Sequence, residues 1–243
     1  MHSSRQPPQD LAWDGCHNAR DLGGLPTADG RTTLRGRIVR ADALDRLTAA
    51  GWQTLLDHGV RTVIDLREPS ERSPDLVPRP ADVRSVMVAL DVREDKEFWE
   101  VWANGPHFGT PLYYRPHIAR QPARNAAVLR AIAHADPGGV VFHCQGGRDR
   151  TGQIAMLLLA LVGVVPEAIA ADYAHSRERQ RALWAARGEP DQGVPIDAFI
   201  ASRGTTQEQM ILDALEDLDV REALGPAGLT DRDVERLRAR LLD

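Results

Sequence analysis

At positions 143–152 the chain reads His-Cys-Gln-Gly-Gly-Arg-Asp-Arg-Thr-Gly. This stretch follows the β-rich run 140–143 and precedes the apolar run 154–165. In a turn between a strand and a helix, backbone N–H groups can converge on one centre, and the helix N-terminus adds unpaired donors. The stretch therefore predicts a strand, a phosphate-sized anion site and a helix. A Walker loop is excluded because no Lys follows the glycines.

Outward from this stretch, β-rich runs alternate with helical patterns. The β-rich runs cover 37–40, 60–66, 83–90 and 140–143, and helices are expected over 48–58, 96–119 and 122–135. After residue 165 only helices are expected, over 166–175, 177–187, 205–218 and 230–241. Strands interleaved with helices predict an α/β fold. We expect a mostly parallel central sheet flanked by helices, with a helical C-terminal part.

Length and composition favour one globular domain. The chain has 243 residues, of which 42% are hydrophobic and 27% charged, so it can bury a substantial core. No long linker rich in Pro, Ser or Gly divides it. We expect a disordered N-terminal segment over 1–10 and a single domain over 11–243.

Charge and hydropathy exclude several classes of partner. The 30 Lys and Arg residues are outnumbered by 35 Asp and Glu, for a net charge of −5, so no nucleic-acid binding is expected. The longest apolar run, 154–165, is too short to cross about 30 Å of hydrocarbon, so no stable membrane insertion is expected. No export signal is visible, which favours a cytoplasmic location and leaves unconventional secretion open. The oligomeric state also stays open.

A cysteine and an arginine give the 143–152 stretch its chemistry. The thiolate is the nucleophilic form of cysteine, and a helix N-terminus with nearby guanidinium groups favours it at Cys144. Arg150 offers a planar fork that matches two phosphoryl oxygens and stays charged. The Thr151 hydroxyl is expected to donate a hydrogen bond to the sulfur. The expected phosphate-binding residues are Gln145, Gly146, Gly147, Arg148, Arg150 and Thr151.

Cysteine content limits the other possibilities. Cys16 and Cys144 are the only cysteines, too few for a disulfide framework or a thiolate-rich metal site. The pair Cys16-His17 has no further expected metal ligand nearby, so no metal and no cofactor are expected. A protective disulfide between Cys16 and an oxidised Cys144 stays open.

The pattern His-Cys-x-x-Gly-x-x-Arg-Thr-Gly resembles that of the cysteine-dependent protein-tyrosine phosphatase superfamily. A bacterial branch, which includes secreted mycobacterial and listerial phosphatases of triple specificity, extends it to Gly-Lys-Asp-Arg-Thr-Gly. This chain has Arg148 in place of that Lys. The runs 18–24, 27–30, 37–42 and 63–67 are similar to the N-terminal half of that branch, in order. The resemblance covers about residues 13–175 and implies a phosphatase-like fold.

The resemblance implies a role for each residue of the motif. Cys144 corresponds to the nucleophile that forms a phosphocysteine, and Arg150 to the arginine that clamps the phosphate. Asp149 corresponds to a loop acid proposed for proton transfer, and it is the expected general acid because no Trp-Pro-Asp motif is present. Alternatively, Asp149 only pairs with Arg148 or caps the loop. Asp91, directly after an expected strand, is then the reserve acid.

The expected activity is hydrolysis of phosphate monoesters by a protein-tyrosine phosphatase, with dual specificity left open. The expected partner is a phosphorylated protein or a phosphoinositide. Arg148 keeps the positive charge that, in related phosphatases, helps to accommodate the extra phosphates of inositol lipids. Gln145 is neutral where dedicated lipid phosphatases often have a cation, so phosphoproteins are favoured. The alternatives are a phosphoinositide phosphatase, a rhodanese-like sulfur carrier and a non-catalytic pseudophosphatase that binds phosphoproteins.

Residues outside the motif have expected supporting roles. His143 is expected to order the loop backbone through a side-chain hydrogen bond rather than to act as a base. Asp65 and Arg67 end an expected strand at the edge where α/β sheets place their ligands, so contact with the loop is expected. By the resemblance, three residues of the N-terminal turn support the loop, although surface ion pairs would also explain them: Asn18, Arg20 and Asp21.

Aromatic residues cluster between the third and fourth β-rich runs. One interpretation is a lid or pocket wall that receives an aryl phosphate, and the other is a local hydrophobic core. The residues concerned are Phe98, Trp99, Trp102 and Phe108.

Overall fold

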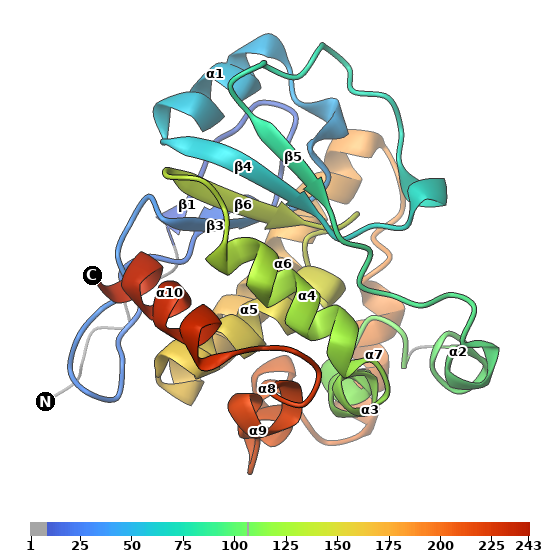
Figure 1. Ribbon diagram of the computed structural model, residues 1–243. Helices are drawn as coiled ribbons and strands as arrows, with labels where there is room; N and C mark the ends of the chain where they lie inside the picture. Colours follow the sequence, from blue (N-terminus) through green and yellow to red (C-terminus); the bar gives the residue numbers. More distant parts are fainter. Residues whose placement is uncertain (1–8, 106) are drawn as a thin grey trace, which may run out of the picture.

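A six-stranded sheet forms the centre of the computed structural model, which describes residues 9–105 and 107–243 (Figure 1). The strand order is β1-β2-β3-β6-β4-β5; the last four strands are parallel and the first two pair antiparallel at one edge. The strands are β1 (Gln9–Asp10), β2 (Arg20–Asp21), β3 (Ile38–Ala41), β4 (Val60–Asp65), β5 (Arg84–Met87) and β6 (Gly139–His143). The predicted α/β fold with a mostly parallel sheet is confirmed.

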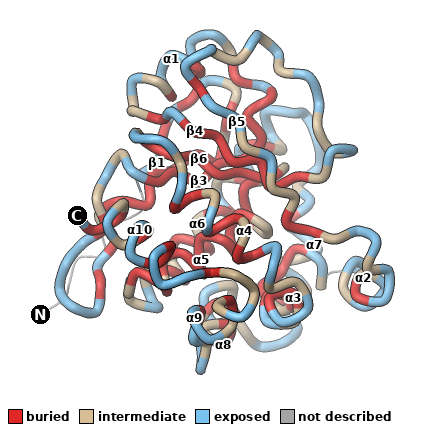
Figure 2. The backbone as a smooth tube through the Cα atoms, in the orientation of Figure 1, coloured by how far each residue is buried: buried red, intermediate tan, exposed pale blue. Residues whose placement is uncertain are grey.

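Helices cover both faces of the sheet, which explains why every residue of β3, β4 and β6 except Arg61 is buried. On one face α1 (Ala49–Asp57) contributes Trp52 and Leu55 to a core that includes Val39, Val63 and Val141. The alternate strand residues, such as Ile64 and Phe142, belong to the larger core. The helices that lie on that side of the sheet (Figure 1) include α4 (Pro122–Ala133), α5 (Asp149–Val162) and α10 (Asp231–Leu242). Figure 2 shows that buried residues concentrate in the sheet and in the helices directly beneath it.

The central helix of the larger core is α5 (Asp149–Val162), whose first turn forms the last part of the 143–152 stretch. Eleven of its residues are buried, and it ends at Gly163, whose φ of 88° is a left-handed conformation favourable for glycine. After a short turn, α6 (Pro166–Arg187) begins at Pro166 and ends at Gly188 (φ 66°). The two helices predicted over 166–175 and 177–187 are therefore one continuous helix, since no breaker separates them.

The other helices follow the predicted helical regions, with two additions. The expected helix over 96–119 is divided into α2 (Lys96–Trp102), η3 (Pro111–Tyr113) and α3 (Tyr114–Arg120). Two short helices were not predicted, α7 (Val194–Ser202) and α9 (Val220–Leu224); in α7 only Ile200 is buried, so its apolar periodicity is weak. The remaining helical elements are η1 (Leu44–Arg46), η2 (Pro69–Glu71), α4 (Pro122–Ala133), α8 (Gln207–Leu215) and α10 (Asp231–Leu242).

The N-terminal prediction requires a correction. Disorder was expected over 1–10, but Gln9 and Asp10 form β1 by pairing with Asp21 and Arg20. Local composition could not predict this pairing because its partner lies ten residues further along the chain. Residues 1–8 of that expected segment lie outside the described residues. Within the described chain, no helix combines the length and hydropathy required to span a bilayer.

The C-terminal helix completes the larger core. Leu237 of α10 is fully buried in the same hydrophobic cluster as α4 and α5. If residues 11–243 form a single domain, we expect Leu237→Ala to lower the free energy of unfolding by about 2–5 kcal/mol in one cooperative transition. Urea unfolding followed by circular dichroism tests this, with the exposed Arg232→Ala as the control. An unchanged main transition would contradict the single-domain prediction.

Candidate active site

The turn between β6 and α5 is fixed by hydrogen bonds to its carbonyl groups. Each carbonyl oxygen from residue 144 to residue 149 accepts a hydrogen bond from the surrounding protein or from α5. The bonds are His143 Nδ1 to Cys144 O (3.1 Å), Ala43 N to Gln145 O (3.1 Å), Asn18 Nδ2 to Gly146 O (3.0 Å), Arg40 Nη2 to Gly147 O (2.7 Å), Gly152 N to Arg148 O (2.6 Å) and Tyr114 Oη to Asp149 O (2.7 Å). The carbonyls are therefore directed outward from the turn.

The backbone N–H groups of the turn have the opposite arrangement. Within the described residues, no acceptor binds the N–H groups of residues 145–148. These donors precede the N-terminus of a 14-residue helix, whose dipole favours a negative charge at the same place. Gly147 has a φ of 67°, and a Cβ there would lie 2.6 Å from Asp42 N, so only glycine fits. The turn can therefore bind an anion through its main chain.

A buried ionic network anchors the turn from below. Asp172 in α6 accepts hydrogen bonds from Arg40 Nη1 (2.5 Å) and Arg20 Nε (2.7 Å), and all three side chains are buried. Burial alone would raise the pKa of Asp172, but the two guanidinium groups hold it below its ordinary value. Arg20 Nη1 also donates to Asn18 Oδ1 (2.6 Å), and Asn18 binds the turn. A role for Asp172 was not predicted from the sequence. Its partners Arg20 and Arg40 lie in the runs 18–24 and 37–42, whose similarity to the phosphatase branch was the available signal.

The predicted catalytic residues lie together in one cavity of about 320 Å³. Cys144 is 3% exposed there, at the start of the turn, and Arg150 lies in the first turn of α5. Carboxylates, aromatic rings and residues of α6 complete the lining: Glu71, Asp91, Asp149, Phe108, Tyr113, Gln180, Leu183, Trp184 and Arg187 among others. The predicted grouping of Cys144, Arg150 and Asp149 is thus what the structure contains.

Arg150 is held by two carboxylates that lie far from it in the sequence. Its Nη1 and Nη2 bind the two carboxylate oxygens of Glu71 at 2.6 and 2.7 Å, and Nη1 lies 3.4 Å from Asp91 Oδ2. Burial would raise the pKa of Glu71, but Arg150 holds it below its ordinary value. No described residue binds Nε, so that edge of the guanidinium fork stays available for an anion. Glu71 was not predicted from the sequence.

Arg148 and Asp149 differ in how their side chains are used. Arg148 is 2% exposed, and its guanidinium donates to Asp149 Oδ1 (3.2 Å), to Gln180 Oε1 (3.2 Å) and to the Gly109 carbonyl. All three of its guanidinium nitrogens therefore have protein partners. The Asp149 side chain is 28% exposed in the cavity. The structure thus contains the predicted Arg148–Asp149 pair. It also places the Asp149 carboxyl group in the cavity with Cys144, as the role of an acid would require.

Two loop-supporting predictions are confirmed by contacts. Arg67 Nη1 donates to Gln145 Oε1 (3.1 Å), and Arg67 is itself held by Asp65 and Asp45. The bond from His143 Nδ1 to Cys144 O is the predicted ordering contact. Burial lowers the pKa of His143, so the ring is neutral and donates through Nδ1.

Two other predictions are wrong. The Thr151 hydroxyl has no hydrogen-bond partner among the described residues, so the expected bond to the sulfur is not present; the side chain is fully buried in the first turn of α5. Asp21 does not support the loop. Its carboxylate instead accepts from the N–H groups of Gly23 and Gly36 and binds His58, which fixes the turn that follows β2.

The aromatic cluster serves both predicted purposes. Phe98 is buried in the hydrophobic core, whereas Phe108 is 47% exposed, lines the cavity and stacks on Tyr113 with ring centroids 6.3 Å apart. Trp99 connects them, because its ring contacts both Phe98 and Phe108. The cluster is therefore a core at one end and a cavity wall at the other.

Both cysteines are free thiols. The Cys16 thiol donates to Asp42 Oδ1 (2.7 Å) in the smaller core, whereas Cys144 belongs to the larger core. The disulfide that the sequence left open is therefore not formed. Among the described residues, no group of three or more His, Cys, Asp or Glu side chains is arranged to hold a metal.

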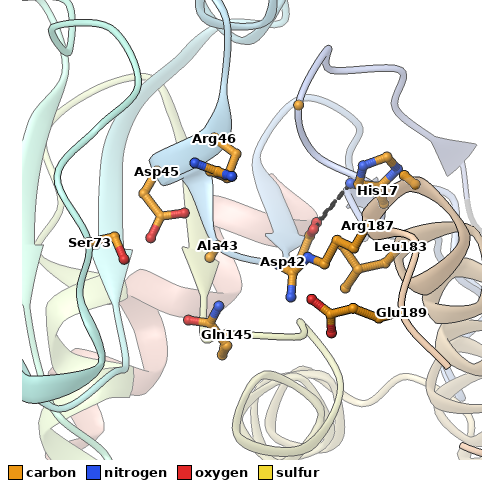
Figure 3. A pocket seen from close by; sticks show the side chains of 12 residues that line it. His17, Asp42, Ala43, Asp45, Arg46, Ser73, Gln145, Leu183, Arg187 and Glu189 are labelled. Atoms are coloured by element: carbon orange, nitrogen blue, oxygen red, sulfur yellow. Dashed lines mark hydrogen bonds between the residues drawn. The ribbon is translucent and has the colours of Figure 1, made fainter. Parts of the chain in front are cut away.

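Figure 3 shows the residues that line a second cavity, of about 630 Å³. Gln145, Leu183 and Arg187 line both cavities. In Figure 3, Asp45 and Ser73 lie on one side of the second cavity, and Leu183 and Glu189 lie on the other. The two cavities therefore adjoin at the residues they share, and together they are larger than a phosphate requires.

The fold and the turn place an arginine and main-chain N–H donors, unpaired within the described chain, beside a cysteine. Comparison with known proteins agrees: the chain belongs to the tyrosine phosphatase family, whose model matches residues 11–243. A Cupriavidus necator protein named as a tyrosine-protein phosphatase is 34% identical over 183 residues, which are 73% of this chain and 66% of that protein. PtpB of Mycobacterium tuberculosis, named a triple specificity protein phosphatase, is 32% identical over 194 residues, 68% of each chain.

The chain thus spans about two thirds of the length of these relatives. Among solved structures, the crystal structure of TpbA from P. aeruginosa matches with a TM-score of 0.47 and 16% identity. That match covers 93% of this chain and 99% of TpbA.

The Asp172 network gives a test of how the turn is held. We expect Asp172→Asn to lower the free energy of unfolding by about 3–5 kcal/mol, because it leaves two buried guanidinium groups without a counter-charge. The effect should be full above the unfolded-state pKa of Asp172 and disappear as the pH falls through its lower folded-state pKa. Chemical denaturation at several pH values measures it. Asp29→Asn, which breaks an exposed ion pair, is the control, and an equally small effect would contradict the expectation.

Proposed function

We propose that this protein hydrolyses phosphate monoesters, with phosphotyrosine in proteins as the preferred substrate. One observation carries the proposal. The outward carbonyls leave the N–H groups of residues 145–148 without acceptors, beside both Cys144 and the open edge of Arg150. Donors, a permanent cation and a nucleophile are the three requirements for holding and attacking a phosphoryl group.

The reaction takes two steps. Cys144 Sγ attacks phosphorus, so an S–P bond forms while the ester P–O bond breaks, and a carboxylic acid in the cavity gives its proton to the leaving oxygen. Water then attacks the phosphocysteine, the carboxylate takes the water proton, and the S–P bond breaks to release phosphate and the thiolate. Throughout, Arg150 and the turn N–H groups stabilise the non-bridging oxygens. The acid expected from the sequence is Asp149, with Asp91 as the alternative.

The surroundings of the cavity support a phosphoprotein substrate. Phe108 and Tyr113 offer aromatic surfaces to an aryl ring, and the adjoining second cavity gives room for the polypeptide beside it. The Arg148 guanidinium is already bound by protein groups, which weighs against its use for additional phosphates of an inositol lipid. The relatives named above, tyrosine and triple specificity phosphatases, also favour this class.

The mechanism predicts the behaviour of two variants. We expect Cys144→Ser to abolish turnover of para-nitrophenyl phosphate, because the hydroxyl is a far weaker nucleophile. We expect Arg150→Lys to lower kcat by about a hundredfold, since an ammonium cannot form the bidentate contact. Steady-state assays with EDTA present measure both. Turnover that survives Cys144→Ser, or that EDTA abolishes, would reject the proposal.

The aromatic wall predicts selectivity. We expect Phe108→Ala to raise KM for a phosphotyrosine peptide by about fivefold, through the loss of ring stacking, and to leave KM for the matching phosphoserine peptide unchanged. Val101→Ala, which removes an exposed apolar side chain outside this cavity, is the control. Equal changes on both peptides would argue against an aryl subsite. Inositol lipids assayed in parallel distinguish the phosphoinositide alternative.

A further inference from the structure

Asp91 occupies an unusual position in the active-site cavity. It follows β5, is 6% exposed and lines the same cavity as Cys144. Its two carboxyl oxygens face different neighbours: Oδ2 lies 3.4 Å from Arg150 Nη1, and Oδ1 lies 4.0 Å from His117 Nε2. One oxygen is therefore on the side of the phosphate-binding arginine, and the other is turned toward the protein interior.

A chain of buried amides determines which atom of His117 faces Asp91. The main-chain carbonyl of Gln121 can only accept a hydrogen bond, so the side-chain atom of Asn125 that faces it (2.9 Å) is the donor Nδ2. Asn125 Oδ1 is therefore directed away from Gln121. Gln153 Nε2 donates to that oxygen (2.7 Å) and also to His117 Nδ1 (2.8 Å). His117 Nδ1 is therefore an acceptor. In the neutral ring the hydrogen must then be on Nε2, the nitrogen that faces Asp91.

His117 Nε2 is a donor without an acceptor. The side chain is fully buried, and among the described residues no hydrogen bond is made by Nε2. Burial lowers the pKa of His117 to about 4, so the ring is neutral at physiological pH. The 4.0 Å gap to Asp91 Oδ1 exceeds a hydrogen-bond length by about 1 Å, so the bond requires the carboxyl group to move toward the ring.

We propose that Asp91 is the acid that protonates the leaving oxygen and that His117 is the residue that positions it. This rests on the phosphatase activity proposed above and concerns the same site. Asp91 Oδ2, on the Arg150 side, carries the transferable proton, while Oδ1 receives the His117 Nε2–H. In the first step the Oδ2–H bond breaks as the leaving oxygen gains the proton. The resulting carboxylate, held by His117, takes a proton from water in the second step.

Asp149 is less suited to this role by its contacts. Its Oδ1 accepts from Arg148 Nε (3.2 Å), and its side chain is 28% exposed, so the carboxyl group is both paired and open to solvent. Asp91 is far more buried, and burial favours the protonated form. The pKa of Asp91 is raised to about 6, chiefly by burial.

Several charged groups face Asp91 and act on that pKa. Arg150 and Arg93 lower it, and Glu71 and Glu68 raise it. Neutral His117 and the Tyr113 phenol complete its surroundings from α3 and η3. Because the proton donor must be protonated, activity should fall as the pH rises through about 6.

Leaving-group dependence identifies the acid. We expect Asp91→Asn to lower kcat/KM for phenyl phosphate, a poor leaving group, by about a hundredfold or more, and for difluoromethylumbelliferyl phosphate, a good one, only slightly. The decline of activity above pH 6 should also disappear. We expect Asp149→Asn to change both substrates by the same factor and to keep that decline. The reverse result for the two aspartates would overturn the proposal.

The positioning role has its own test. We expect His117→Leu to lower kcat/KM for phenyl phosphate by about tenfold, since the acid is no longer held. Loss of the Nε2–H donor also removes a bond to the carboxylate, so the basic limb of the pH profile should move to higher pH. His117→Gln, whose amide can donate from a similar place, should restore both readouts. If His117→Leu lowers kcat/KM equally for both substrates and the basic limb of the pH profile does not shift, His117 has only a structural role and the proposed positioning of Asp91 is refuted.

Failure of this inference can be distinguished from failure of the proposed function. Retained turnover of the good leaving group by Asp91→Asn and His117→Leu shows that the fold, Cys144 and Arg150 still work. If Cys144→Ser is inactive and neither aspartate variant shows leaving-group dependence, the phosphatase proposal stands and the Asp91 assignment falls. Urea unfolding of each variant separates lost stability from lost chemistry.

Discussion

The outward orientation of six consecutive carbonyls is the constraint on which the site depends. A carbonyl that pointed into the cavity would repel an anion, and a free carbonyl in a buried turn would cost about 1–3 kcal/mol. Donors from β3 and the residue Ala43 beyond it, the N-terminal turn, β6, α3 and the first turn of α5 prevent both by binding each of these carbonyls. Because each carbonyl is bound by the scaffold, the N–H groups of the same turn find no acceptor on the cavity side in the part of the chain that the structure describes. The proposed anion site is therefore a consequence of how the scaffold binds the carbonyls.

The scaffold that supplies these donors is itself charged and buried. Arg40 can reach the turn only because Asp172 neutralises it, and Asp172 is held in turn by Arg20. Removal of one member leaves a charge without a partner in the interior, which explains why a buried network of this kind behaves as a unit. Stability and the conformation of the turn therefore rest on the same side chains, and Arg150 repeats the pattern at the cavity surface with Glu71 and Asp91.

Sequence reasoning succeeded where a structure is determined by neighbours in the chain. The order of strand, glycine turn and helix at 143–152 predicted β6, the turn and α5, and the apolar runs predicted the parallel strands. It failed for contacts between distant residues. Thr151 was expected to bind the sulfur only because it is adjacent to Arg150, but its hydroxyl has no partner among the described residues. Asp21 was expected to support the loop, but its carboxylate instead accepts from the backbone N–H of Gly23 in the turn after β2. Glu71 is 79 positions from Arg150, so nothing local indicated it.

The sequence by itself determined the fold class and predicted that Cys144 and Arg150 flank the turn between β6 and α5, because these follow from local periodicity and from a contiguous motif. Only the tertiary structure decided which carboxylates face Arg150, which tautomer His117 adopts and which walls surround the cavity. The physical reason is that burial and hydrogen-bond direction are properties of a packed environment. A carboxyl group such as Asp91 acquires its acidity from neighbours that the chain brings together only on folding.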